Sequence, residues 1–131
     1  MKKTGIINAP LSAVVAKLGH LDSIAIADAG LPIPKDVIRI DLALKEGVPG
    51  FMETLGVVLT EMQIEKIILA EEIKEHNPGI LNEIEALIGE VEIDFMSHDE
   101  FKTTTKLTRA IIRTGEFSPY ANIILVSGVV F

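Results

Sequence analysis

Two short polar segments flank one apolar run near the N-terminus, and they contain residue types that can move a proton. Residues 19–22 include His20, residues 27–30 include Asp28, and residues 23–27 between them have the length of a buried strand. Imidazole is the natural proton-transfer group near neutral pH, because its ordinary pKa is about 6.5. A nearby carboxylate can orient an imidazole or bind a hydroxyl group. The spacing of His20 and Asp28 around one strand therefore favours acid–base chemistry.

A second candidate pair lies about a hundred residues further along the chain. Tyr120, the only tyrosine, and Asn122 are two residues apart in a loop that leads into a final apolar segment. In extended backbone these two side chains point to the same side. The pair suits a sugar, because a phenol ring packs on a C–H face and an amide both donates to and accepts from hydroxyls. The structural alternative is an ordinary turn with one anchoring aromatic ring.

The remaining candidate site residues are the other two histidines and a set of basic residues that follows His98. His98 follows a predicted strand at a helix start, either as a site residue or as a helix residue without a role. Lys102 is one helical turn from His98 and can reach the same pocket. Four basic residues also have the three- or four-residue spacing of a solvated helix face: Lys102, Lys106, Arg109 and Arg113. His76 lies in a helix-start turn and is predicted to be structural or exposed. With no cysteine and no HxH or HxxxH spacing, no metal site is expected.

The segments that carry these residues alternate between helical and extended patterns. Apolar residues at helical spacing predict a helix that starts at an Asn8 cap and ends near residue 18. The same spacing predicts helices at 51–62, 78–88 and 98–107, and Ser97 caps the last of these. Strands are predicted at 23–27, 37–42, 66–70, 90–95, 110–114 and 122–126. The alternation predicts an α/β fold, a single compact domain over 1–131 with a largely parallel central sheet flanked by helices. No glycine-rich phosphate motif is present, so a nucleotide is not expected.

Composition narrows the classes of partner. The net charge of −7 argues against nucleic acid, which needs a cationic face. No run reaches the roughly 18 apolar residues of a membrane helix. After Met1-Lys2-Lys3 no continuous apolar segment of a signal peptide forms, so a cytoplasmic location is the default expectation. Hydrophobic residues make up 48% of the chain, and this surplus is most simply buried between subunits.

Four separated motifs together resemble the D-ribose pyranase and fucose mutarotase family. They are GHLD at 19–22, DAGLPIP at 28–34, MSHDEFK at 96–102 and PYAN at 119–122, with GVVF at 128–131. The resemblance spans the whole chain. It implies an α/β subunit in pentameric rings that stack in pairs as a homodecamer, with a sugar site at a subunit interface. It also implies that His20 is catalytic and that Asp28, His98, Tyr120 and Asn122 bind the sugar, with Lys102 a weaker candidate.

The implied reaction interconverts the pyranose and furanose forms of ribose through the open-chain aldehyde. The anomeric hydroxyl loses a proton, the ring oxygen gains one, and a different hydroxyl then attacks the aldehyde. No redox or phosphoryl chemistry occurs, so no cofactor is expected, and proton-transfer groups poised near pH 7 suffice. Two alternatives stay open: a non-catalytic sugar-binding protein that accompanies ribose uptake, and a mutarotase that prefers fucose. His20→Ala separates enzyme from binding protein, because only an enzyme then loses turnover while it still binds sugar.

Overall fold

A computed structural model describes all residues from 1 to 131. The helices are α1 (Ala9–Lys17), α2 (Phe51–Leu59), α3 (Ile73–His76), α4 (Pro78–Ile88), α5 (His98–Thr104) and the 3₁₀-helix η1 (Thr105–Leu107). The strands are β1 (Ser23–Ala27), β2 (Ile38–Asp41), β3 (Ile64–Ala70), β4 (Glu92–Met96), β5 (Ala110–Arg113) and β6 (Ile123–Ser127). No helix is long and apolar enough to span a bilayer.

The six strands form one sheet in the order β2-β5-β1-β6-β3-β4. The β2·β5, β5·β1 and β3·β4 pairs are parallel, whereas β6 runs antiparallel to both of its neighbours, β1 and β3. The predicted, largely parallel α/β sheet is therefore confirmed, with β6 as the one reversed strand. As a consequence, the residues that precede β6 arrive at the same edge of the sheet as the residues that follow β1, β3, β4 and β5.

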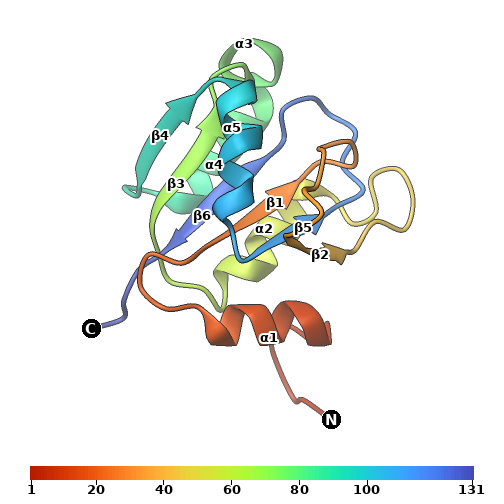
Figure 1. Cartoon of the computed structure of the whole chain (residues 1–131), viewed down its shortest axis with the longest axis vertical. Coiled ribbons are helices and arrows are strands. Elements are labelled where there is room, and N and C mark those ends of the chain that lie inside the picture. Colours follow the sequence, from red (N-terminus) through yellow and green to blue (C-terminus); the bar gives the residue numbers. More distant parts are fainter.

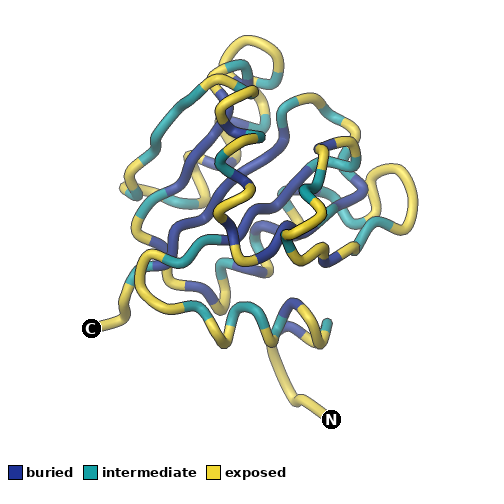
Figure 2. The backbone as a smooth tube through the Cα atoms, in the orientation of Figure 1, coloured by how far each residue is buried: buried dark blue, intermediate teal, exposed yellow.

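Side chains of alternate residues divide the core between the two faces of the sheet. On β1, Ile24 and Ile26 join the larger core cluster, which includes Phe51 and Leu55 of α2. The alanines between and after them, at 25 and 27, join the smaller cluster around Phe101 of α5. Figure 1 shows α5 in front of the sheet with α2 and α4 behind it. Figure 2 shows the four central strands, β5, β1, β6 and β3, as the buried centre, whereas the outer strands β2 and β4 are more exposed. The central strands are therefore fixed by burial on both faces, and the residues just beyond their ends are the ones that can carry exposed polar groups.

The helix caps predicted from the sequence are confirmed at two positions. The Asn8 side chain accepts the N–H of Leu11 at 3.0 Å, which starts α1. The Ser97 hydroxyl accepts the N–H of Glu100 at 3.2 Å, which starts α5 directly after β4. Helix α3 was not predicted, because its four residues are too few to show a helical period. His76 is its last residue and still lies just before α4, so the predicted helix-start turn also ends a short helix.

Candidate functional site

Asp28 and Asn122 form a reciprocal pair where β1 ends and β6 begins. The Asn122 Oδ1 atom accepts the backbone N–H of Asp28 at 2.8 Å, and its Nδ2 atom donates to Asp28 Oδ2 at 2.9 Å. Asn122 is completely buried, so both ends of its amide must be satisfied inside the protein. The carboxylate is thereby fixed at the edge of the sheet where ligands of α/β proteins usually bind.

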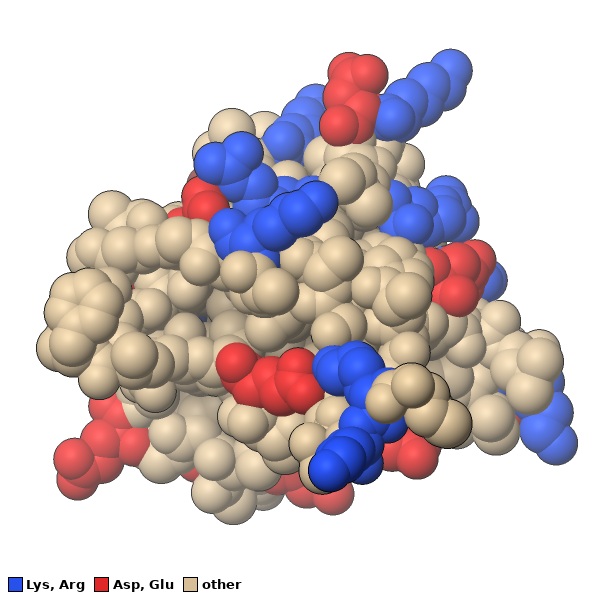
Figure 3. Space-filling model, turned by 90° about the horizontal axis from the view of Figure 1, so that it is seen from below, with Lys and Arg blue, Asp and Glu red and all other residues tan.

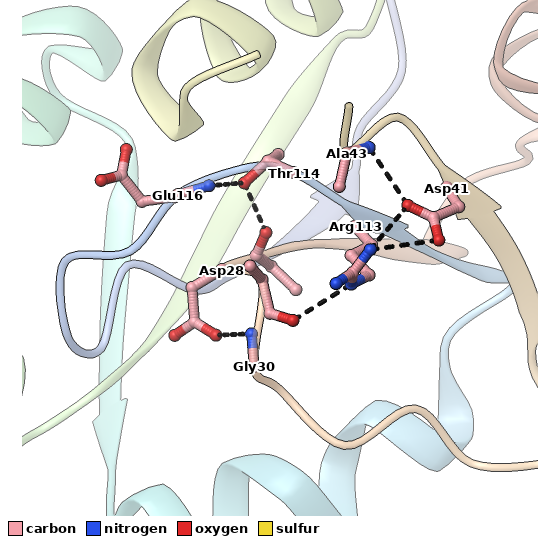
Figure 4. A network of polar contacts seen from close by, with 9 residues as sticks. Asp28, Gly30, Asp41, Ala43, Arg113, Thr114 and Glu116 are labelled. Carbon is pink, nitrogen blue, oxygen red and sulfur yellow. Dashed lines mark hydrogen bonds and ion pairs between the residues drawn. The ribbon is translucent and has the colours of Figure 1, made fainter. Parts of the chain in front are cut away.

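The turn after Asp28 is held by a second set of polar contacts, shown in Figure 4. Asp28 Oδ1 accepts the N–H of Gly30 at 2.9 Å. The guanidinium of Arg113 donates to the Ala29 carbonyl at 3.0 Å and to the Asp41 carboxylate at 3.2 Å. Because Arg113 pairs with Asp41, it does not neutralise Asp28. Each Asp28 oxygen accepts one hydrogen bond within the chain and keeps a second lone pair that can accept a hydroxyl group.

His98 and Tyr120 lie at the same edge. Their rings meet edge to face, with centroids 5.1 Å apart and an interplanar angle of 87°. Both carboxylate oxygens of Glu72 accept the backbone N–H of His98 at 3.0 Å, which anchors the first residue of α5. The Nδ1 atom of His98 is buried without a hydrogen-bond partner. Such an orphan polar atom is costly unless a ligand or water satisfies it.

Glu116 shapes the loop that leads to Tyr120. One carboxylate oxygen accepts the N–H of Phe51 at 3.0 Å, and the other accepts the N–H and the hydroxyl of Ser118 at 3.2 and 2.9 Å. Partial burial opposes the charged form, but the hydrogen bonds from Phe51 and Ser118 outweigh it and hold the pKa of Glu116 below its usual 4.5. Beside this loop and Asp28 is an open hollow of about 400 Å³, within the usual size range of ligand pockets.

His20 lies at the opposite edge of the sheet, before β1 begins. Its Nε2 atom is 2.9 Å from Oε2 of Glu65 on β3. The β3·β6 register shifts between Ile64 and Lys66, so Glu65 occupies a bulge, a feature that redirects a side chain. His20 also lines a hollow of about 440 Å³ with residues 127–131. Sequence reasoning missed Glu65, because nothing local links it to a histidine 45 positions earlier.

The loop that carries His20 is braced by Asp22. The Oδ2 atom of Asp22 accepts the N–H of Gly19 at 2.9 Å, and Oδ1 accepts from the Arg109 guanidinium at 2.9 and 3.0 Å. The hydrogen bond from Gly19, followed by that from Arg109, holds the pKa of Asp22 below its usual 3.8. Asp22 therefore has a structural role in the loop before β1.

Two sequence-based expectations need correction. Within one chain Asp28 does not orient His20, because β1 separates them: five residues at about 3.3 Å each place them roughly 16 Å or more apart. The basic residues from 102 to 113 do not form one helix face, since Arg113 belongs to β5 and Arg109 precedes it. Lys102 does lie on α5, where it pairs with Asp99 at 3.0 Å. That hydrogen bond and charge hold the pKa of Asp99 below its usual 3.8.

The backbone N–H of Asn122 donates to the Tyr120 carbonyl at 2.9 Å, which joins the Asp28–Asn122 pair to the Tyr120–His98 pair at one edge of the sheet. A dyad of His20 and Glu65 lies at the other edge. Residues 1–130 match the model of the RbsD / FucU transport protein family. The chain belongs to this family.

Individual proteins are also similar to this chain over its full length. It is 56% identical to the D-ribose pyranase of Pasteurella multocida over the full length of both chains. The structure of Bacillus subtilis RbsD complexed with D-ribose superposes with a TM-score of 0.97 at 53% identity, covering 100% of each chain. The fucose mutarotase of Streptococcus pneumoniae, solved in complex with L-fucose, matches over 100% of both chains with a TM-score of 0.82 at 28% identity.

Proposed function

We propose that this chain, as one domain over residues 1–131, interconverts the pyranose and furanose forms of D-ribose in the cytoplasm, without a cofactor. The observation that carries the proposal is the linked set of Asp28, Asn122, Tyr120 and His98 at one edge of the sheet. It combines hydroxyl-binding groups, an aromatic wall and an unpartnered imidazole nitrogen. The full-length similarity to D-ribose pyranases supports ribose as the sugar.

The complete site is proposed to form between two subunits. His20 and the Asp28–Asn122 pair lie at opposite edges of one sheet, so a neighbouring copy must supply one of the two parts. Exposed apolar side chains accompany both parts: Leu21, Val130 and Phe131 near His20, and Phe117 near Asp28. Figure 3, which views the underside of the molecule, shows wide stretches without charged side chains. Pentameric rings paired into a homodecamer are the proposed assembly.

In this site each group has a defined task. His20 moves the proton, taking it from the anomeric hydroxyl or delivering it to the ring oxygen as the ring opens. Glu65 holds Nε2 of His20, which leaves Nδ1 to face the sugar. The Asp28 carboxylate, the Nδ1 atom of His98 and the Asn122 amide bind sugar hydroxyls, and Tyr120 packs against the sugar. Asn122 also fixes Asp28. These contacts hold the open-chain aldehyde so that a different hydroxyl can attack it.

The test is NMR magnetisation transfer between the ribose pyranose and furanose signals, with and without the protein. We expect the protein to accelerate this exchange, and EDTA to leave the acceleration unchanged. Binding of ribose without faster exchange would instead identify a sugar-binding protein. The same experiment on L-fucose anomers tests the mutarotase alternative, which the 28% identity to the Streptococcus pneumoniae enzyme supports less strongly than the 56% identity to a D-ribose pyranase supports ribose.

A further inference from the structure

Helix α3 contacts both segments that carry the candidate sugar site, which are the start of α5 and the loop before β6. From its N-terminal end, Glu72 accepts the backbone N–H of His98 at the start of α5. After its C-terminal end, the side-chain amide of Asn77 donates to Ser118 Oγ at 3.0 Å and to the Pro119 carbonyl at 2.8 Å. The short helix therefore holds both the α5 start and the loop before β6 in place.

Between these two anchors, His76 places its ring against Tyr120. The centroids are 5.5 Å apart with an interplanar angle of 39°, within the range of favourable aromatic pairs. Tyr120 thus has one imidazole on each side, His76 from α3 and His98 from α5. The His76 side chain itself is exposed to solvent and makes no hydrogen bond or ion pair.

Tyr120 needs such support. Its backbone φ is +57°, in the left-handed region that residues other than glycine rarely adopt. A residue in that conformation persists only when its surroundings hold it there. The two imidazoles and the Asn77 contacts provide this constraint from neighbouring elements.

We propose that His76 is a positioning residue of the sugar site, whose ring holds the Tyr120 phenol in the orientation that receives the sugar. The proposal rests on the proposed function for the identity of the ligand. His76 acts through Tyr120, so its loss weakens ribose binding while the exchange rate at saturating ribose stays close to normal. The aromatic ring carries this role, and phenylalanine can therefore replace histidine.

Tyr120 provides its own reporter, because the chain has one tyrosine and no tryptophan. Acrylamide quenching of tyrosine fluorescence therefore measures the exposure of this side chain alone. We expect His76→Ala to increase quenching and to raise the Kd for ribose by about 2- to 12-fold, the loss of one aromatic pair. His76→Phe is expected to restore both values. Glu75→Ala is the matched control, since this neighbouring exposed side chain makes no hydrogen bond or ion pair, and both values should match the wild type.

The outcomes separate this proposal from the proposed function. If the wild type accelerates ribose exchange but His76→Ala leaves quenching and Kd unchanged, or His76→Phe behaves like His76→Ala, His76 has no positioning role. A drop in the saturated exchange rate without a change in Kd would also overturn it. If the wild type neither binds ribose nor accelerates exchange, the proposed function fails first, and a quenching change in His76→Ala then reports packing alone.

Discussion

At the scale of single residues, Asn122 does the most to set the geometry of the sugar-binding edge. Its amide satisfies the backbone and the carboxylate of Asp28 at once, in a fully buried position. Asn122→Ala removes both contacts and leaves polar groups unpaired, so we expect a loss of about 1–3 kcal/mol in the free energy of unfolding, with weaker ribose binding. Urea unfolding and ribose titration measure the two effects. Asn82→Ala, an exposed change on α4, is the control and should neither lower the free energy of unfolding nor weaken ribose binding.

His20 is expected to act on the moving proton more than on the bound sugar. His20→Ala should lower the ribose exchange rate by about 10²–10⁴-fold, the usual contribution of a general acid or base. The Kd should rise by no more than about 2- to 12-fold, the value of one hydrogen bond. Exchange by NMR and binding by calorimetry are compared on the same variant. Equal losses of rate and affinity would assign His20 to binding.

Glu65 is the partner that sequence reasoning did not find. Because its carboxylate holds Nε2 of His20, Glu65→Ala frees the ring to rotate, and we expect the exchange rate to fall by about 10-fold with ribose affinity retained. Glu65→Gln keeps a hydrogen-bonding side chain and should lose less. Both are measured at saturating ribose. An exchange rate that Glu65→Ala leaves at the wild-type value would show that His20 needs no orienting group.

At the scale of elements, sequence patterns were sufficient for the sheet and insufficient for the site. Apolar runs placed all six strands within a few residues of their observed bounds, and caps placed the starts of α1 and α5. Both succeed because burial and capping are local requirements. The antiparallel direction of β6 was not predicted, since its apolar residues fit either direction. Helix α3 was missed because four residues show no period. His20 and Asp28 lie far apart because the extended strand β1 runs between them. The short motifs around the two residues do not show this distance.

Glu116 links two elements, and the link makes the fold sensitive to acid. The N-cap residue of α2 is Gly50, which has no side chain to accept the helix N–H groups, and Glu116 supplies this contact from the loop after β5. Glu116→Ala should cost about 0.5–2 kcal/mol of unfolding free energy at pH 7, as for loss of a helix cap. Glu46→Ala, an exposed change without side-chain contacts, is the control.

The pH dependence of this effect follows from the lowered pKa of Glu116. A carboxyl whose folded pKa lies below its unfolded value stabilises the fold above the unfolded pKa, and this contribution is lost as pH falls through the folded pKa. The difference between wild type and Glu116→Ala should therefore be complete above about pH 4.5 and narrow below it. Urea midpoints measured from pH 7 to pH 3 follow this change. A difference that stays constant over that range would mean that the charge of Glu116 is not involved.

At the scale of the whole molecule, a site shared between subunits, as proposed, predicts that the protein is a multimer. Thirteen large apolar side chains are exposed on the single chain, and they include residues beside both halves. A surface of this kind is typical of a subunit that buries it against identical neighbours. Light scattering is expected to show a multimer, and a stable monomer would remove the basis for a shared site.

Subunit mixing tests the shared site directly. One variant, His20→Ala, lacks the proton-transfer half, and a second, Asp28→Ala with Asn122→Ala, lacks the hydroxyl-binding half. Each alone should have very low exchange activity. In a multimer that assembles at random from equal amounts of both, a site between neighbours receives each intact half with probability one half, so about one quarter of the sites are complete. Co-expression should therefore restore about one quarter of the wild-type exchange rate. If each site lay within one chain, every site in the mixture would carry a defect, and the rate would stay at that of the separate variants.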